Sequence, residues 1–215
     1  MKIVAVIFDA FGTLVDIRRR TNPFRALLLE GRNNGRKYRS DDVHTLMTVP
    51  LSLEAAADHL CIQVSQTKLQ QLQALLDEEL DSIVAFEEAP LAVAELEQVG
   101  LKIGICSNLA APYGTIVRRL FPTVCATGFS YEVGVLKPDP LIYQAVCSDL
   151  GVVPGQLFGG KGVALMIGNS LWRDCYGARA AGIKGFHLQR SPGKPLPDLE
   201  TFSRLILDQI GSDES

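Results

Sequence analysis

The chain has 215 residues, 47% of them hydrophobic and 21% charged, a balance that argues against disorder and indicates a globular protein. Its 21 Lys and Arg against 24 Asp and Glu give a net charge of −3, which argues against a nucleic-acid partner. No apolar run reaches the ~20 residues of a membrane span, so we expect no membrane partner. The five cysteines are scattered without a CxxC pair, which favours a reducing, cytoplasmic location over disulfides or a zinc site.

Unbroken apolar runs rich in β-branched residues alternate with helical patterns along most of the chain. Such runs are typical of strands that are covered on both faces of a parallel sheet. The runs lie at 3–8, 101–106, 163–167 and 183–188, and the helical patterns at 89–99, 112–120, 140–150, 174–181 and 198–210. The alternation predicts right-handed βαβ units, and therefore an α/β fold with a Rossmann-like, doubly wound parallel sheet.

The segment 17–88 interrupts this alternation, because it shows no strand pattern. Leucines at three- and four-residue steps in 66–84 predict an amphipathic helix. Residues 53–60 predict another helix, with Ser52 as its N-cap, and the polar stretch 31–42 predicts a loop. We therefore expect an α/β core of residues 1–16 and 89–215 with an inserted helical cap at 17–88.

Residues 155–162, GQLFGGKG, fit most of the phosphate-loop pattern GxxxxGK[ST]. Gly162 stands where the pattern needs the hydroxyl that binds Mg²⁺. The segment also precedes a predicted strand, whereas a phosphate loop follows a strand and opens a helix. We interpret it as a flexible connection and not as a nucleotide site.

Polar residues gather where the predicted strands end, which is where open parallel sheets bind ligands. They are Asp9, Ser107, Asn108, Asn169 and Asp174, and Lys137, which precedes a predicted helix, could join them at the same edge. A strand-end Asp before a Gly-Thr turn can act as a nucleophile, and a nearby Lys137 would hold Asp9 ionised. Ser107 and Asn108 can donate hydrogen bonds to an anionic substrate or leaving group. Asp174 could bind a metal, polarise a water, or cap the helix that follows it.

Four motifs, in this order and spacing, resemble those of the haloacid dehalogenase superfamily: FDAFGTLVD, ICSN, VLKPDP and GNSLWRDCYGARAAG. The resemblance implies a Rossmann-like core, a mobile cap, and a hydrolase that forms an aspartyl-enzyme intermediate on a small anionic molecule. It also implies that Asp9 is the nucleophile and that Thr13 supports it. Ser107, Lys137 and Asp174 match the later motifs as catalytic residues.

Two positions depart from the phosphatases of that superfamily. Phe11 stands where they carry a second Asp, and Asn169 stands where they usually carry an Asp. A phenyl ring cannot donate the proton that an alkoxide leaving group needs, whereas a halide leaves without one. Asn169 removes a negative charge from any Mg²⁺ site, which weakens the binding of a hard dication. Both departures favour nucleophilic substitution at carbon.

The 2-haloacid dehalogenase branch is similar to this chain in the aromatic residue at Phe11 and in Asn108, which would cradle the halide. Tyr143 matches that branch's contact to the substrate carboxylate. The resemblance implies that Asp9 attacks C2 of the acid, and that a water activated by Asp174 hydrolyses the ester without a cofactor. The branch carries an asparagine at the position of Leu171 here. It also uses a cap arginine, for which this chain offers Arg18 to Arg20, Arg36 and Arg39.

Two alternatives stay open at this point. One is a Mg²⁺-dependent phosphatase, in which Asp9, Asp174 and the carbonyl of Phe11 hold the metal. The other is a binding module that has lost catalysis. The candidate substrate-binding residues are Phe11, Thr13, Asn108, Tyr143 and Asn169. A homodimer is also left open.

Overall fold

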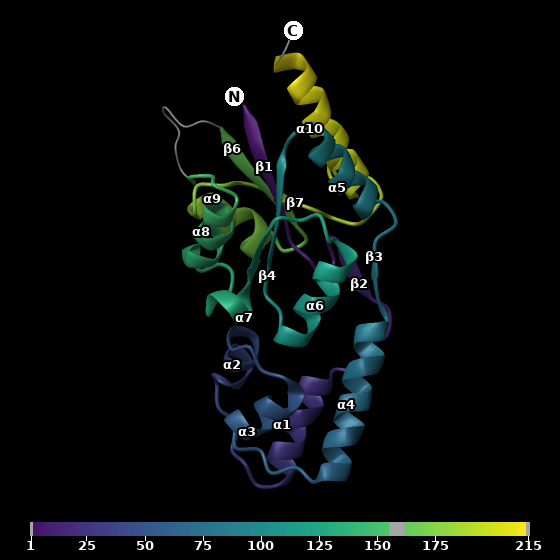
Figure 1. Ribbon diagram of the computed structural model, residues 1–215, viewed down its shortest axis with the longest axis vertical. Helices are drawn as coiled ribbons and strands as arrows, with labels where there is room; N and C mark the ends of the chain where they lie inside the picture. The colour runs from purple at the N-terminus through teal and green to yellow at the C-terminus, as the bar shows by residue number, and fades with distance from the viewer. Residues whose placement is uncertain (1, 155–161, 214–215) are drawn as a thin grey trace.

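The computed structural model describes residues 2–154 and 162–213. Within these residues the centre of the protein is a five-stranded sheet in the order β5-β4-β1-β6-β7, with every neighbouring pair parallel (Figure 1). The strands are β1 (Ile3–Phe8), β4 (Lys102–Ser107), β5 (Ala126–Phe129), β6 (Val163–Gly168) and β7 (Lys184–His187). The predicted doubly wound parallel sheet is therefore confirmed.

Helices cover both faces of this sheet, because alternate residues of each strand point to opposite sides. In β1, Val6 and Phe8 pack into one apolar cluster, while Ala5 and Ile7 pack into the other. The first cluster includes α5 (Ala89–Gln98), α6 (Ala111–Leu120) and α10 (Leu199–Asp213), and the second includes α8 (Pro140–Asp149) and α9 (Ala178–Ala180). Burial on both faces explains why the strands read as unbroken apolar runs.

Most elements of the core match the prediction, with two differences. The edge strand β5 was not predicted, because its four residues include a Thr and a Gly and form no apolar run. The helix expected at 174–181 begins earlier, as a π-helical segment η1 (Leu171–Gly177) that continues into α9. Its N-cap is Ser170, whose side chain accepts a hydrogen bond from the Arg173 N–H, so Asp174 is not the cap.

Four helices of the described chain lie together at one end of the sheet, and we call them the helical unit (Figure 1). They are α1 (Pro23–Asn33), α2 (Asp42–Thr48), α3 (Leu53–His59) and α4 (Gln66–Asp81). The predicted helices at 53–60 and 66–84 are α3 and α4, and Ser52 caps α3 as predicted. Helices α1 and α2 were not predicted. They extend into both ends of the stretch 31–42, so the loop there is shorter than predicted.

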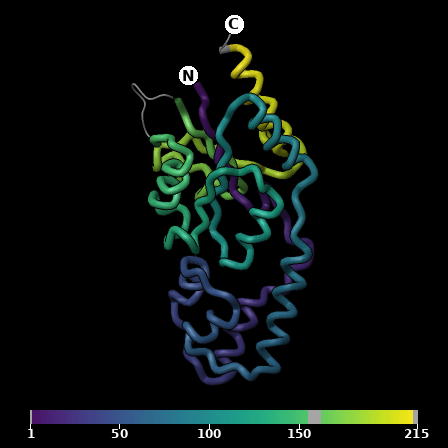
Figure 2. Tube along the Cα trace, viewed as in Figure 1, coloured from purple at the N-terminus to yellow at the C-terminus, as the bar shows by residue number. Residues whose placement is uncertain are grey.

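The expectation that 17–88 holds no strand is wrong. β2 (Val15–Ile17) and β3 (Ile83–Ala85) form an antiparallel ribbon in which Asp16 lies opposite Val84. The trace in Figure 2 shows both crossings between the sheet and the helical unit on one side of the molecule. Strands of three residues are too short for a periodic pattern to show, and this pair joins segments far apart in the sequence.

A short helix, α7 (Ser130–Val133), follows β5. The phosphate-loop-like stretch falls almost entirely at 155–161, outside the described residues, so its interpretation stays a prediction. All five cysteines lie within the described residues and are free thiols. Across 2–154 and 162–213, no helix combines the length and the apolar character that crossing a bilayer requires.

Candidate active site

The ammonium group of Lys137 lies between two carboxylates at the carboxyl end of the sheet. Its Nζ is 2.8 Å from Asp9 Oδ1 and 2.7 Å from Asp174 Oδ1. It also donates to the carbonyl oxygen of Cys106 at 2.7 Å. These contacts use all three N–H donors of the ammonium. Asp9, Lys137 and Asp174 are 6%, 3% and 1% exposed, so the cluster is nearly sealed from bulk water.

The charges of this cluster shift two pKa values. Burial alone would lower the pKa of Lys137, but the charges of Asp9 and Asp174 outweigh it and hold that pKa above its ordinary value. Burial raises the pKa of Asp174 above its ordinary value, against the opposing effect of Lys137. Lys137 therefore stays charged, and Asp174 is a stronger base than a solvated aspartate. The neighbouring Cys106 stays a neutral thiol, because burial raises its pKa to about 12.

Asp9 is held at the end of β1 by three neighbouring elements. Its backbone N–H donates to the Ile167 carbonyl at 3.0 Å, which continues the pairing with β6. The hydroxyl of Ser107, the last residue of β4, donates to Asp9 Oδ1 at 3.0 Å. The hydroxyl of Thr13 donates to Asp9 Oδ2 at 3.3 Å. Asp9 Oδ1 thus has the two stronger contacts, from Lys137 and Ser107, and Oδ2 has a single long one.

The turn after Asp9 requires a glycine. Gly12 has a φ of +80°, a left-handed conformation that side chains rarely adopt, and a Cβ there would lie 2.0 Å from Asn169 Nδ2. The side chain of Asn169 therefore rests directly against the turn. Gly168, at the end of β6, is constrained by space alone, because a Cβ there would overlap the carboxylate of Asp174. These two glycines let the backbone approach the polar groups of the site.

Arg190 fixes the same turn from outside, and the sequence analysis did not identify it. Its guanidinium donates to the carbonyl oxygens of Thr13 at 2.6 Å and Gly12 at 3.3 Å. It also pairs with Glu88 at 2.6 Å and lies 3.6 Å over the ring of Phe86. The arginine follows the last strand of the sheet, far from any recognised motif, so no local pattern pointed to it.

Asn108 contacts Lys137 through both ends of its side-chain amide. Its Nδ2 donates to the Lys137 carbonyl at 3.0 Å, and its Oδ1 accepts from the Lys137 backbone N–H at 2.7 Å. Asn108 therefore positions the lysine that binds both carboxylates. An amide nitrogen carries two N–H groups, so one of them is left for a ligand.

A cavity of about 130 Å³ opens at this cluster, and we call it the Asp9 cavity. It is lined by Asp9, Phe11, Ser107, Asn108, Lys137, Asn169, Ser170, Arg173 and Asp174. The structure thus brings together all the sequence-predicted site residues except Thr13 and Tyr143. Thr13 is fully buried and reaches the site through Asp9.

Tyr143 does not reach the site, which corrects the expectation that it contacts the substrate. It is fully buried in the apolar cluster between the sheet and α8. Its hydroxyl donates to the backbone carbonyl of Arg173. The residue therefore supports the segment that carries Arg173 and Asp174 from behind.

Arg173 lines the Asp9 cavity and, like Ser170, was not among the predicted site residues. Adjacent helical residues point in different directions, so a residue next to Asp174 was not expected to share its cavity. The guanidinium of Arg173 forms no ion pair with any described residue, although it is exposed beside two carboxylates. It is a cation available to an anionic ligand.

A larger, mostly apolar cavity of about 670 Å³ adjoins the Asp9 cavity, and we call it the apolar cavity. Neither cavity is lined by the arginines that the sequence analysis offered for the role of the cap arginine, Arg18 to Arg20, Arg36 and Arg39. Arg36 is instead paired with the buried Asp42 through two hydrogen bonds of 2.6 and 2.7 Å. The arginines of the helical unit that line the apolar cavity are Arg25 and Arg32.

The Asp9 cavity is a poor match for Mg²⁺, which prefers octahedral oxygen coordination. Its carboxylates, among the residues that line it, are Asp9 and Asp174, and each already has an oxygen bound by Lys137. Phe11 and Asn169 offer no negative charge. Within the described ranges, no three His, Cys, Asp or Glu side chains are grouped to hold a metal. The two carboxylates, which share one ammonium, would therefore bind Mg²⁺ only weakly.

The fold is similar to solved structures of more than one activity. A HAD phosphatase from Thermococcus onnurineus matches with 20% identity and a TM-score of 0.60, over 95% of this chain and 98% of that chain. An L-2-haloacid dehalogenase from Xanthobacter autotrophicus matches with 19% identity and a TM-score of 0.59, also over 95% and 98%. These likenesses show the shared fold and leave the substrate open.

Among curated proteins, a phosphoserine phosphatase from Thermus thermophilus is 28% identical over 111 residues. The match spans 49% of this chain and 41% of the length of that relative. A family model described as haloacid dehalogenase-like hydrolase matches residues 3–182, which is most of the chain. The resemblance carried by the four motifs is thereby confirmed, and the chain belongs to the haloacid dehalogenase-like hydrolases.

Proposed function

We propose that this hydrolase releases halide from a 2-haloacid by a metal-independent reaction through an ester of Asp9. The observation that carries the proposal is the lining of the Asp9 cavity. A nucleophilic carboxylate held by a buried ammonium faces Phe11, which supplies neither a proton nor a metal ligand. A leaving group that departs as a stable anion needs neither.

In the first step, Asp9 Oδ2 attacks C2 of the acid. The new bond is between Oδ2 and C2, and the carbon–halogen bond breaks with its electron pair leaving on the halide. Oδ2 is the better attacking oxygen because its contact to Thr13 is long, whereas Lys137 and Ser107 both bind Oδ1. Asn108 lines the same cavity, and its remaining N–H would donate to the departing halide.

In the second step, a water attacks the carboxyl carbon of the Asp9 ester and gives its proton to Asp174. The negative charge then develops on Asp9 Oδ1, which already accepts from Lys137 Nζ at 2.8 Å and Ser107 Oγ at 3.0 Å. Preorganised donors at such an oxygen typically contribute ~10²–10³-fold each to the rate. Collapse breaks the bond between the carboxyl carbon and Oδ2, Asp174 passes its proton to the departing oxygen, and the 2-hydroxyacid is released. The new carboxyl group of Asp9 then loses its remaining proton to solvent.

Arg173 supplies the binding group for the substrate carboxylate. It lines the Asp9 cavity and forms no ion pair in the described part of the chain. Charge-assisted hydrogen bonds from a guanidinium to a carboxylate can be bidentate and are stronger than neutral ones. The helical unit, within the predicted cap at 17–88, supplies one wall of the adjoining apolar cavity and would exclude water from the reaction.

Halide release from both enantiomers of 2-chloro- and 2-bromopropanoate tests this proposal. We expect release to persist after exhaustive chelation, and Asp9→Asn to lower it at least about 10³-fold, because the nucleophile is removed. Asp149→Asn, an exposed aspartate of α8, is the matched control and should retain full activity. In a single turnover in H₂¹⁸O, the label should enter Asp9 and not the 2-hydroxyacid.

Halide release that survives in Asp9→Asn, or label that appears first in the product, would exclude the ester.

A Mg²⁺-dependent phosphatase is the second candidate, because a relative found among curated proteins is a phosphoserine phosphatase. It requires release of phosphate from simple phosphate esters that stops when a chelator is added. Both assays on one preparation separate the two reactions.

A further inference from the structure

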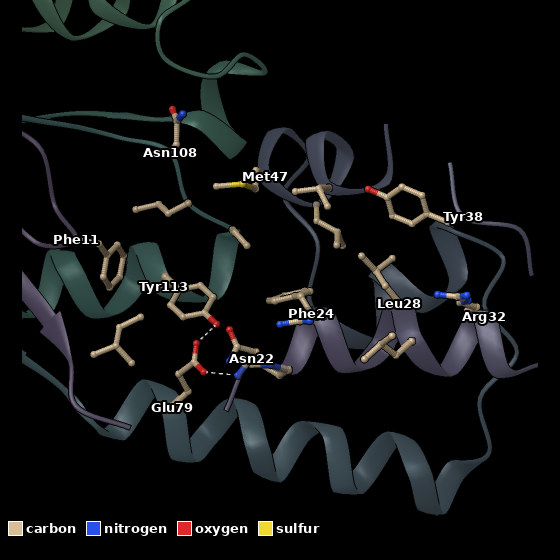
Figure 3. Close-up of a pocket in the computed structure, with 18 residues that line it drawn as sticks. Phe11, Asn22, Phe24, Leu28, Arg32, Tyr38, Met47, Glu79, Asn108 and Tyr113 are labelled. Carbon is tan, nitrogen blue, oxygen red and sulfur yellow. Dashed lines mark hydrogen bonds between the residues drawn. The ribbon is translucent and has the colours of Figure 1, made fainter. Parts of the chain in front are cut away.

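The apolar cavity lies between the helical unit and the core (Figure 3). Its walls come from α1, α2 and α4 on one side, and from the turn after β1 and the start of α6 on the other. Aromatic and aliphatic side chains make up most of the lining, among them Phe24, Leu28, Met47, Leu109 and Tyr113. A hollow of this composition binds hydrocarbon in preference to water.

The apolar cavity adjoins the Asp9 cavity, because Phe11 and Asn108 line both. The ring of Phe11 meets that of Tyr113 edge-on at 5.8 Å, and Tyr113 meets Phe24 at 6.4 Å. These three rings form an aromatic row that begins at the nucleophile's cavity and runs into the apolar one. A ligand held at Asp9 can therefore extend along this row.

The polar groups at the edge of the apolar cavity are already satisfied or solvated. Glu79 accepts from the hydroxyl of Tyr113 at 2.7 Å and from the backbone N–H groups of Thr21 and Asn22 at 2.5 and 2.6 Å. Its carboxylate is used within the protein and does not bind a cationic substrate group. Arg32 is exposed and lies at the end of the cavity opposite Phe11 in Figure 3. Arg25, which also lines the cavity, is exposed to solvent, and most of the remaining lining is apolar.

The Asp9 cavity and the apolar cavity differ in volume, and a very small substrate held at Asp9 would leave the larger one unfilled. The Asp9 cavity, at about 130 Å³, suits a carboxylate and the reacting carbon. The apolar cavity, at about 670 Å³, lies in the range of roughly 300–1,000 Å³ that encloses much larger ligands. We propose that the substrate is an acid with an extended apolar body, an alkyl chain well beyond propanoate, which lies in the apolar cavity while its head reacts at Asp9. The nature of the head rests on the proposed function, whereas the apolar body rests on the cavity itself.

A chain-length series of 2-bromoalkanoates, from propanoate through butanoate and hexanoate to octanoate, tests the inference. We expect kcat/KM for halide release to rise by about fourfold per added methylene until the cavity is full. Leu28→Trp narrows the cavity from α1 and should lower the octanoate-to-propanoate ratio of kcat/KM at least tenfold. Leu91→Trp makes the same substitution on an exposed face of α5 and should leave the ratio unchanged.

Met47→Trp narrows the cavity from α2 and repeats the test if Leu28→Trp does not fold. A ratio near one in the wild type, or a ratio that both cavity variants leave unchanged, overturns the inference.

A binding series keeps the inference separate from the proposed function. Octanoate and propanoate, and octyl and methyl phosphate, are titrated into the wild-type protein by calorimetry. If no bromoalkanoate releases halide, the proposed reaction is wrong, and the inference is judged on these ligands alone. Tighter binding of the octyl member, weakened by Leu28→Trp but not by Leu91→Trp, supports an apolar body. Equal affinity of long and short members, or binding of neither, contradicts it.

Discussion

The two adjoining cavities are built on different principles. The Asp9 cavity is lined mainly by charged and polar groups at strand ends, and its carboxylates and ammonium have fixed hydrogen-bond partners. The apolar cavity is several times larger and is walled by side chains from two parts of the molecule. On the proposed function, the sheet would fix the chemistry, while the surface between core and helical unit would select the substrate.

The rigidity of the two cavities differs for the same reason. In the Asp9 cavity a single ammonium binds side chains from β1 and η1 and the backbone of β4. Across the apolar cavity, the helical unit meets the core through Glu79 with Tyr113, and through the Met47 carbonyl with the Ser130 hydroxyl. Displacing one wall of the apolar cavity therefore disrupts fewer polar contacts than displacing a member of the Asp9 cavity.

The largest effect is expected at Lys137, because the Asp9 cavity depends on this one cation. Lys137→Met should reduce turnover at least about 10³-fold, because it removes the donor at Asp9 Oδ1. It should also lower the free energy of unfolding by about 3–5 kcal/mol, since two buried carboxylates lose their partner. Halide release and urea unfolding measure the two effects.

Lys194→Met removes an exposed lysine and is the matched control, for which neither quantity should change. Activity of Lys137→Met within tenfold of the wild type would contradict the view that the Asp9 cavity depends on this cation.

The next effect concerns the ion pair of Arg36 and Asp42. It lies in the helical unit, which forms one wall of the apolar cavity, but it does not line the cavity itself. Arg36→Ala leaves Asp42, 1% exposed, without its bidentate partner and should lower the free energy of unfolding by about 3–5 kcal/mol. Arg32→Ala removes an arginine of the same unit that forms no ion pair in the described ranges, and should change stability by less than about 0.5 kcal/mol. Thermal and urea unfolding of the two variants give the comparison, and equal losses would contradict it.

The same pair carries a pH dependence. The Arg36 hydrogen bonds hold the pKa of Asp42 below its ordinary value. A group whose folded-state pKa is lowered stabilises the protein above its unfolded pKa of ~3.9 and loses that contribution as the pH falls. The stability difference between the wild type and Arg36→Ala should therefore shrink on acidification.

The smallest effect is a shift in the acid limb of the pH–rate profile, which is the range where the rate falls as the pH is lowered. Asp174 must be ionised to accept a proton from water, and burial raises its pKa. Hydrolysis of the Asp9 ester should therefore slow as the pH falls, with a midpoint above the ordinary Asp value of ~3.9. Single-turnover rates of product formation across pH measure the limb. A rate that is flat down to pH ~4 would exclude Asp174 as the base.

The residues of the Asp9 cavity were predictable because parallel strands end at a common edge. Asp9 and Asp174 come after two of these strands, and Ser107 ends a third. Lys137 binds Asp9 as expected, and it also binds Asp174, which was not predicted. Tyr143 was wrongly assigned, because its spacing from Lys137 in a motif does not reveal which face of α8 is buried.

The apolar cavity could not be predicted, since no pattern within one element encodes it. Phe11, Leu28 and Tyr113 lie on separate elements that meet only when the helical unit folds against the core. Arg190 escaped prediction for a related reason, because its partners are backbone carbonyls more than 170 residues away. Contacts of this kind depend on tertiary packing and leave no local signature.

The ribbon of β2 and β3 has a topological consequence. The chain leaves the core at Ile17 and returns at Ile83, and these two residues are paired across the ribbon. The Arg18 N–H donates to the Ser82 carbonyl at 3.2 Å, so the ends of the intervening segment are already adjacent. A tight hairpin turn could join them without disturbing the five-stranded sheet of the described residues. The segment behind the ribbon is thus an exchangeable module, which evolution or an engineer can replace while Asp9 stays in place.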